Sequence, residues 1–142
     1  TAEGRGATHA LDFSTETDAY RDYVTNTRGE FTVAKDQNIR LRSGWFSERS
    51  AQYLAAGRPV ITGDSPAARE FLKDGEDCLL CEAGNPLALA AAIRRMRQDL
   101  RLSAKLAEGG RGSFNEKASP AVIGRNLCQR LATWEREDVS VA

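Results

Sequence analysis

The stretch SGWFSER, residues 43 to 49, combines residue types that could hold an anion. Gly44 allows a ligand to approach the backbone closely, and Ser43 and Ser47 offer hydroxyl groups. The first turn of a helix leaves backbone N–H groups unpaired and has a partial positive charge, which favours phosphate. Three arginines flank the loop: Arg40, Arg42 and Arg49. One interpretation is therefore a phosphate site at the start of a helix, and the other is an ordinary capped loop.

The residues of this loop alone do not decide between the two interpretations. The loop matches neither GxGxxG nor the P-loop pattern. Trp45 and Phe46 are either core anchors or a platform on which a flat ligand stacks. His9 is the only histidine, and we expect it at the surface rather than in a catalytic role.

The cysteines indicate packing rather than metal binding. Cys78 and Cys81 enclose two leucines in a run typical of a buried strand, where positions three apart point to opposite faces. This pair is therefore badly placed to share a metal, and we expect core packing for both and for Cys128. Three cysteines do not make a disulfide framework, and free thiols are typical of a reducing, cytoplasmic compartment.

The composition is that of an ordinary soluble domain. A chain of 142 residues predicts one domain, and its 41% hydrophobic and 28% charged residues are usual for a globular protein. Twenty basic residues balance twenty acidic ones, so no basic excess indicates nucleic acid or an anionic membrane as a partner. No apolar run reaches the roughly 20 residues of a spanning helix, and the start lacks the apolar segment of a secretory signal.

Strand and helix patterns alternate up to about residue 86, and helical patterns alone follow. We expect strands at residues 7–13, 30–34, 59–62 and 78–81, a polar loop at 35–38, and helices at 17–27, 47–57, 65–72, from 86, 100–108 and from 120. A helix over residues 29–36 stays open as an alternative. Gly109 and Gly110 are expected to end the helix that begins at Leu100.

Several helix starts and faces are predicted from capping residues and apolar spacing. Thr17 and Ser47 are candidate N-caps, and Gly57 suits a left-handed C-terminal position. Serine or asparagine precedes proline at three further starts: Ser65–Pro66, Asn85–Pro86 and Ser119–Pro120. The expected apolar stripes are Ala51, Leu54 and Ala55; Leu89, Ile93 and Met96; and Val122, Ile123, Leu127, Leu131 and Trp134.

This order of elements predicts an α/β fold: a Rossmann-like three-layer α/β/α arrangement with a mainly parallel sheet and a helical C-terminus. Ligands of such sheets lie beyond the carboxyl ends of the strands. We therefore expect the ligand site at the loops around residues 35–47 and 62–66.

The run AAGRPVITGDSPAAREFLKDGEDCLL, followed by GNPLALAAAIRRMRQDLRL, resembles the nucleotide-sugar-binding domain of GT-B glycosyltransferases, in the group called glycosyl transferases group 1. The resemblance covers about residues 13 to 115. The residues that match the family's turns and caps, in order, are Gly57, Pro59, Val60, Pro66, Glu70, Asp74, Gly75, Leu79, Leu80, Asn85 and Pro86.

The resemblance implies a metal-independent site for a nucleotide-diphosphosugar donor, with no cofactor. The backbone around Gly44, Trp45, Phe46 and Ser47, beside Ser43, would face the sugar and diphosphate, and the amides of Glu48 and Arg49 would cap the phosphates. Retaining members have two glutamates eight positions apart, where this chain has Gly44 and Gln52. Glu48 could partly substitute, and Gln52 could bind a ribose hydroxyl. The catalytic residues and the stereochemical outcome are therefore not assigned.

The resemblance also implies a missing half, because GT-B enzymes have a second, N-terminal domain for the acceptor. Residues 1–142 would then be a single C-terminal donor-binding domain, or a fragment of one, in an enzyme that transfers a sugar to an unknown acceptor. Its partners would be the nucleotide sugar and that N-terminal acceptor domain. The alternatives are an inactive GT-B-like interaction module and an unrelated doubly wound domain such as a signalling receiver.

Overall fold

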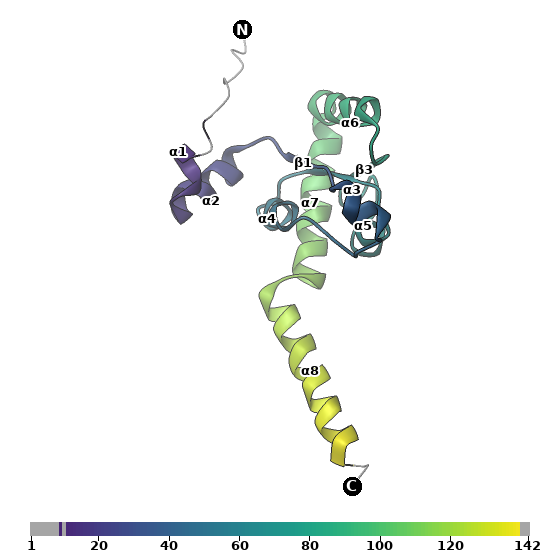
Figure 1. Ribbon diagram of the computed structural model, residues 1–142. Coiled ribbons are helices and arrows are strands. Elements are labelled where there is room, and N and C mark those ends of the chain that lie inside the picture. The colour runs from purple at the N-terminus through teal and green to yellow at the C-terminus, as the bar shows by residue number, and fades with distance from the viewer. Residues whose placement is uncertain (1–8, 10, 140–142) are drawn as a thin grey trace.

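The computed structural model describes residue 9 and residues 11–139, with side chains up to residue 134. Three parallel strands form one sheet in the order β1 (Glu30–Thr32), β2 (Val60–Gly63) and β3 (Leu79–Cys81). The helices of the described residues are α1 (Leu11–Ser14), α2 (Thr17–Asn26), α3 (Asp36–Arg40), α4 (Glu48–Ala55), α5 (Pro66–Phe71), α6 (Pro86–Gln98), α7 (Leu100–Lys117) and α8 (Pro120–Val139). Figure 1 shows α6 and α4 on opposite sides of the strands.

Two apolar clusters confirm the predicted three-layer arrangement. Val60 of the central strand lies in a cluster with residues of α2 and α4, and its neighbour Ile61 lies in a second cluster with residues of α6 and α7. Consecutive side chains of a strand point to opposite faces of the sheet. Both residues are fully buried because helices cover both faces. The predicted inner face of α6 is confirmed as well, since Leu89, Ile93 and Met96 pack against the second cluster.

Cys78, which directly precedes β3, and Cys81, its last residue, lie on the two sides of the sheet, as predicted. Cys78 belongs to the first cluster and Cys81 to the second, and both are buried. Burial raises the pKa of the Cys78 thiol to about 12, so this thiol stays protonated at neutral pH. Cys128 is exposed, so its predicted place in a core is wrong. The described residues contain no group of three histidine, cysteine or acidic side chains that could hold a metal ion.

The N-terminal elements differ from the prediction in two respects. Leu11–Ser14 is helix α1 and not the end of a strand, while residues 7, 8 and 10 of that predicted strand lie outside the described residues. A ring stack stabilises the helix, with the centroids of Phe13 and Tyr23 3.8 Å apart. The predicted helix over residues 17–27 is present as α2, but its N-cap position is Glu16 rather than Thr17.

The segment after β1 is more helical than its polar composition indicates. Residues 35–38 were expected as a loop, but Asp36–Arg40 form helix α3, in which Arg40 pairs with Asp36 at 3.3 Å. Strand β1 is confirmed although it is shorter than expected, and its buried residues are Glu30 and Thr32. Phe31 is 51% exposed, because β1 lies at the edge of the sheet.

The capping prediction holds at three of the four helix starts that it names with a serine or asparagine. Ser47, Ser65 and Asn85 each accept a hydrogen bond from a backbone amide of the helix that follows. Within the described residues the Ser119 side chain accepts no such bond, and its hydroxyl donates to the carbonyl of Asn115 at 3.0 Å. Gly57 follows the C-cap of α4 with a φ of 64°, as predicted.

Helix α4 buries a face that differs from the predicted stripe. Leu54 is fully buried as expected, but its buried companions are Ser50 and Tyr53 rather than Ala51 and Ala55. The prediction counted apolar residues only, so it left out the polar Ser50 and the amphipathic Tyr53.

Helix α7 continues through the two glycines that were expected to end it. A Cβ atom on Gly109 would lie 2.3 Å from the carbonyl oxygen of Glu76, and one on Gly110 would lie 2.5 Å from Cδ2 of Leu54. Both glycines are therefore explained by close approach of α7 to α4 and to the loop before β3.

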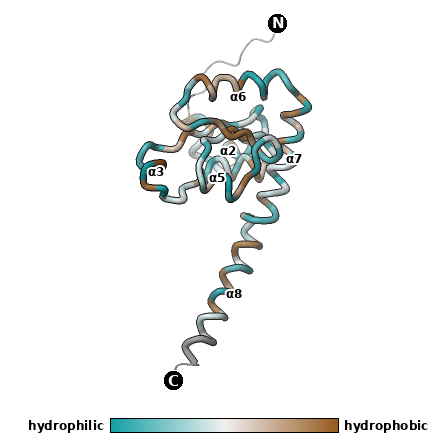
Figure 2. Tube along the Cα trace, turned by 90° about the vertical axis from the view of Figure 1, so that its right-hand side faces the viewer, coloured by the Kyte–Doolittle hydropathy of each residue, from teal (hydrophilic) through white to brown (hydrophobic). Residues whose placement is uncertain are grey.

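Helix α8 leaves the body of the molecule with its apolar stripe uncovered. Ile123, Leu127, Leu131 and Trp134 are between 46% and 61% exposed, whereas the sequence predicted a face packed on the core. Figure 2 shows this helix reaching away from the sheet, with hydrophobic positions recurring along it. None of the described helices is both long enough and apolar enough to cross a membrane.

Replacing Gly110 by alanine is expected to destabilise the fold by about 1–3 kcal/mol, because the added methyl overpacks the contact with Leu54 and Asp77. Gly112→Ala is the matched control, since it lies in the same helix with no atom within 4 Å of the added Cβ. This control is expected to stabilise by about 0.5–1 kcal/mol through helix propensity. Urea unfolding of the two variants measures both changes, and equal effects would contradict the close approach.

Candidate functional site

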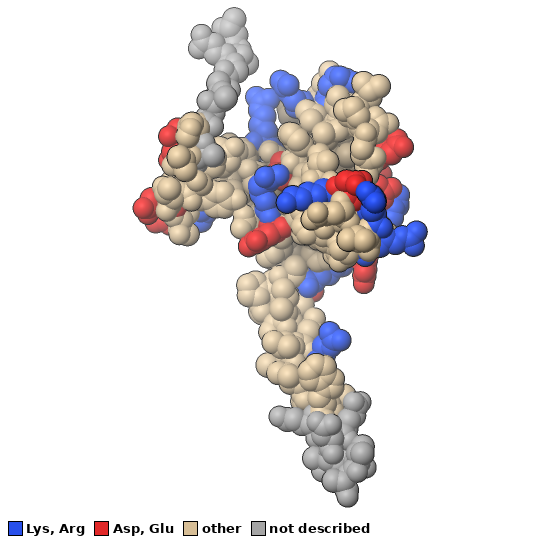
Figure 3. Space-filling view, viewed as in Figure 1, with Lys and Arg blue, Asp and Glu red and all other residues tan. Residues whose placement is uncertain are grey.

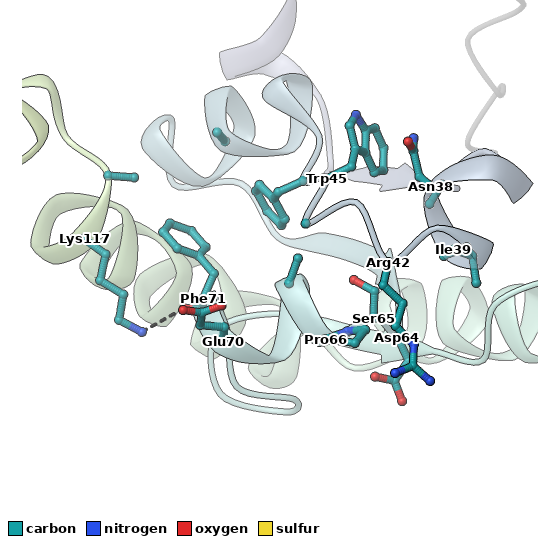
Figure 4. Close-up of a pocket in the computed structure, with 16 residues that line it drawn as sticks. Asn38, Ile39, Arg42, Trp45, Asp64, Ser65, Pro66, Glu70, Phe71 and Lys117 are labelled. Carbon is teal, nitrogen blue, oxygen red and sulfur yellow. Dashed lines mark hydrogen bonds between the residues drawn. The ribbon is translucent and has the colours of Figure 1, made fainter.

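A cavity of about 730 Å³ lies at the loops where the sequence predicted a ligand site. Its wall combines α3 and the loop after it, the loop between β2 and α5, helix α5, and the C-terminal end of α7 (Figure 4). The lining residues are Ala34, Asn38, Ile39, Arg42, Gly44, Trp45, Phe46, Ala51, Asp64, Ser65, Pro66, Ala67, Glu70, Phe71, Lys117 and Ala118. The cavity thus brings together segments that are far apart in the sequence.

The loop of residues 41–47 has an unusual backbone at two positions that line the cavity. Gly44 has a φ of 69°, and Arg42 has a φ of 46°, the one positive value at a non-glycine residue in the described part of the chain. A left-handed arginine costs on the order of 1 kcal/mol, so the surrounding structure must hold it. Part of that hold is visible at Ser43, whose hydroxyl donates to the side-chain oxygen of Asn38 at 3.1 Å.

Aromatic side chains form one wall of the cavity. Trp45 is 38% exposed, and the ring of Phe46 lies 5.3 Å from that of Phe71. Lys117 donates to the carbonyl of Phe71 at 2.8 Å, and its ammonium lies 5.8 Å from that ring. Of the two interpretations of these aromatics, Phe46 fits a half-buried anchor and Trp45 a surface open to a flat ligand.

The start of α4 retains unused hydrogen-bond donors. The Ser47 hydroxyl accepts from the amide of Ser50 at 3.3 Å, and the Ser47 carbonyl accepts from Ala51 at 3.1 Å. The amides of Glu48 and Arg49 have no acceptor within the described residues. Such first-turn amides, together with the helix dipole, favour an anion.

The three arginines that flank the loop do not have equal freedom. Arg49 binds the buried carboxylate of Glu30 at 2.9 Å, and Arg40 pairs with Asp36. Arg42 forms no ion pair within the described residues and lines the cavity. Figure 4 places Arg42 and Lys117 on opposite sides of the cavity, so positive charge is present at both ends.

The remaining residues of the predicted site lie beside the cavity and not in its lining. Gln52 accepts a hydrogen bond from the hydroxyl of Tyr20 at 2.7 Å, and Glu48 is exposed. The lining set thus contains Gly44, Trp45 and Phe46 of the predicted residues, but not Ser43, Ser47, Glu48, Arg49 or Gln52. Their assignment to donor binding stays a prediction.

Several lining residues were not named as site residues: Asn38 and Asp64 lie within the loops where a ligand site was expected, whereas Phe71 and Lys117 lie outside them. Asn38 was expected in a loop, and Lys117 lies beyond the two glycines at which α7 was expected to end. Asp64 immediately follows β2, a position at which a polar residue is a usable signal in parallel sheets. In the structure this carboxylate binds Arg69 through two hydrogen bonds of 2.6 Å.

Comparison with known proteins finds similarity to glycosyltransferases over part of the chain. Residues 45–99 match the family model of glycosyl transferases group 1. A stretch of 67 residues is 37% identical to the lipopolysaccharide core biosynthesis glycosyltransferase LpsD of Rhizobium meliloti (strain 1021). Both matches are to glycosyltransferases. The matched segment includes the loop from Trp45 onwards and the whole of α4, α5 and α6.

Two solved structures share the fold of this chain. The crystal structure of Anabaena Alr3699/HepE in complex with UDP-glucose superposes with a TM-score of 0.66 at 15% identity, over 78% of this chain and 29% of that one. Sucrose-phosphate synthase from Thermosynechococcus elongatus superposes with a TM-score of 0.55 at 21% identity, over 68% of this chain and 23% of that one. The predicted α/β architecture, as part of a GT-B fold, is confirmed.

The chain spans only part of the length of these proteins. The matched stretch covers 44% of the chain and 20% of LpsD, and the chain covers less than a third of either solved structure.

Proposed function

We propose that this chain binds the nucleoside diphosphate of a sugar donor in the cavity beside α4. The observation on which the proposal rests is the position of that cavity, at the carboxyl ends of parallel strands and next to the start of α4 with its two unused amides. The match of residues 45–99 to glycosyl transferases group 1 supports the donor class, and the solved structure of Alr3699/HepE is a complex with UDP-glucose.

The loop residues have distinct roles in this proposal. The amides of Glu48 and Arg49 donate to the phosphates, and Gly44 leaves room for them, since no atom lies within 4 Å of a Cβ built there. Trp45 offers its exposed face to the base or the sugar. Ser43 and Ser47 hold the loop and the helix start in place. Gln52 binds a donor hydroxyl only if it leaves Tyr20.

The proposed reaction is glycosyl transfer to an acceptor hydroxyl. The bond between the anomeric carbon and the β-phosphate oxygen breaks, a bond to the acceptor oxygen forms, and that oxygen loses its proton. Negative charge then develops on the departing nucleoside diphosphate. Arg42 and the first-turn amides stabilise this charge. The proposed donor site uses no metal ion and no cofactor.

The proposal includes an N-terminal acceptor domain of the same enzyme, with residues 1–142 as the C-terminal donor-binding domain. Two surfaces support it. The stripe of α8 is exposed, and so are Phe31 and Val33 at the free edge of the sheet. Large uncovered apolar surfaces usually mark contacts with another domain.

An inactive interaction module is the second candidate. The absence of a carboxylate at Gly44 and Gln52, and the use of Gln52 by Tyr20, favour it.

Gly44→Asp is expected to weaken binding of UDP, GDP, ADP or TDP, whichever binds, about tenfold or more, since a like charge near phosphate costs more than ~1 kcal/mol at a protein surface. Gly75→Asp is the matched control, because Gly75 has a φ of 72°, open space for a side chain and no place in the cavity. Isothermal calorimetry measures both. Binding by the wild type that Gly44→Asp leaves intact would contradict the proposed site, and no binding of any nucleotide would favour the interaction module.

Arg42→Gln is expected to weaken nucleotide binding about fivefold or more, because a charge-assisted hydrogen bond to phosphate is lost. Arg40→Gln removes the same charge from the same segment, but Arg40 is paired with Asp36 and lies outside the cavity lining. We expect this control to bind within about twofold of the wild type, given its exposed ion pair. Calorimetry at one salt concentration measures the nucleotide affinity of both variants. An equal loss of affinity in Arg42→Gln and Arg40→Gln would contradict a specific role of Arg42 and indicate a general effect of charge.

A further inference from the structure

A second concave surface lies where α6 ends and α7 begins. It is an open groove of about 690 Å³ that shares no residue with the candidate donor site. We call it the arginine groove, and its lining residues are Ala91, Arg94, Arg95, Gln98, Asp99, Leu100 and Arg101.

The arginine groove concentrates positive charge in a chain that has no net charge. Four arginines lie within residues 94–101, and the only acidic residue of that segment is Asp99. None of the four forms an ion pair within the residues that the structure describes. Asp99 is engaged as the N-cap of α7, where it accepts from the amide of Leu102 at 2.9 Å. Figure 3 shows Lys and Arg side chains gathered over this end of the molecule, around α6.

Exposed leucines flank these arginines. Leu87 is 78% exposed and Leu100 is 77% exposed. Leu87, Ala91, Arg94 and Gln98 recur at the spacing of one helix face, and this face is exposed, while the opposite face of α6 packs against the sheet. Helix α6 contains no acidic residue. Membrane-surface helices combine basic residues with exposed leucines, and the outer surface around α6 and the start of α7 shares these two features, although the apolar face of α6 itself packs on the sheet.

A compact anion fits the groove poorly. The Asp99 carboxylate lines it, and the C-terminal end of α6 adds partial negative charge, so a small phosphate would meet repulsion beside the arginines. An extended anionic surface contacts the outer guanidinium groups without approaching Asp99 closely. The two leucines would enter the apolar part of a lipid surface, whereas an acidic protein surface gives them no such place.

We propose that the arginine groove docks this chain on a membrane surface that contains anionic lipid. This inference goes beyond the proposed function and does not depend on it. The donor cavity shares no lining residue with the groove. Each arginine near an anionic surface strengthens binding about fivefold, and the effect falls with salt.

The test is co-sedimentation of the full chain with vesicles of phosphatidylcholine alone or with about 30% phosphatidylglycerol, at low salt and at about 0.5 M salt. We expect binding to the anionic vesicles alone, lost at high salt. The variant Arg94→Gln/Arg95→Gln/Arg101→Gln is expected to bind about 50-fold or more weakly, since three contributions are lost. Leu100→Ser is expected to weaken binding about threefold without a change of charge, through lost apolar burial.

The matched control is Arg21→Gln/Arg125→Gln/Arg130→Gln, which removes the same charge from exposed positions on α2 and α8. This variant is expected to bind within about threefold of the wild type, since arginines far from the surface are screened. An equal loss in the two triple variants, no binding to anionic vesicles, or equal binding to neutral ones would overturn the proposal. Amide shifts in the groove on titration with inorganic pyrophosphate, with no vesicle binding, would assign it to a compact anion instead.

Discussion

The buried carboxylate of Glu30 holds the start of α4 against the edge of the sheet. Its side chain is 5% exposed, and its two oxygens accept from Nε of Arg49 and from the hydroxyl of Ser50, each at 2.9 Å. A buried carboxylate is costly unless its hydrogen bonds are made, so the first turn of α4 cannot shift along β1 without leaving this charge unpaired. The loop of residues 41–47, which enters that turn, is therefore held at one position beside the cavity.

The interaction of Glu30 with Arg49 also determines which arginine near the site has no ion-pair partner in the described part of the chain. Arg49 is committed to Glu30 and also donates to the carbonyl of Phe31 at 3.4 Å, which leaves its backbone amide rather than its side chain for a ligand. Arg42 then becomes the free cation of the loop. At the far side, the close approach of Gly110 to Leu54 aligns α7 with α4, and this alignment places Lys117 at the cavity wall. Two packing constraints thus position both charges of the site.

The sequence predicted most of the fold because its signals are local and agree with one another. Ser47, Ser65 and Asn85 mark helix starts, the run from Val60 marks a central strand, and the family motifs match in order. The predictions fail where contacts between segments far apart in the sequence determine the structure. By local sequence, Gly109 and Gly110 indicate the end of a helix. In the structure they lie within α7, where it approaches Leu54 of α4 and the loop before β3 closely. The exposed stripe of α8 likewise has a core pattern, although no described residue covers it.

The position of the candidate site could be predicted from the sequence, but only some of its lining residues could. A loop before a helix at the carboxyl edge of the sheet follows from the order of elements. Of the residues assigned to donor binding from the sequence, three line the cavity: Gly44, Trp45 and Phe46. Which arginine is free depends on the partners of each, and Glu30 reads in sequence as an ordinary strand residue. Lys117 and Phe71 enter the site through the packing of α7 and α5, which spacing does not reveal.

The most direct measurement is the set of amide chemical shifts of the isotope-labelled chain, recorded by two-dimensional NMR during titration with UDP and then with GDP, ADP and TDP. The account predicts that one nucleotide shifts the amides of Gly44, Trp45, Glu48 and Arg49 together with the indole of Trp45, because these groups line the cavity or point from the start of α4. Shifts confined to residues outside this cavity, or no shift with any of the four nucleotides, would contradict it.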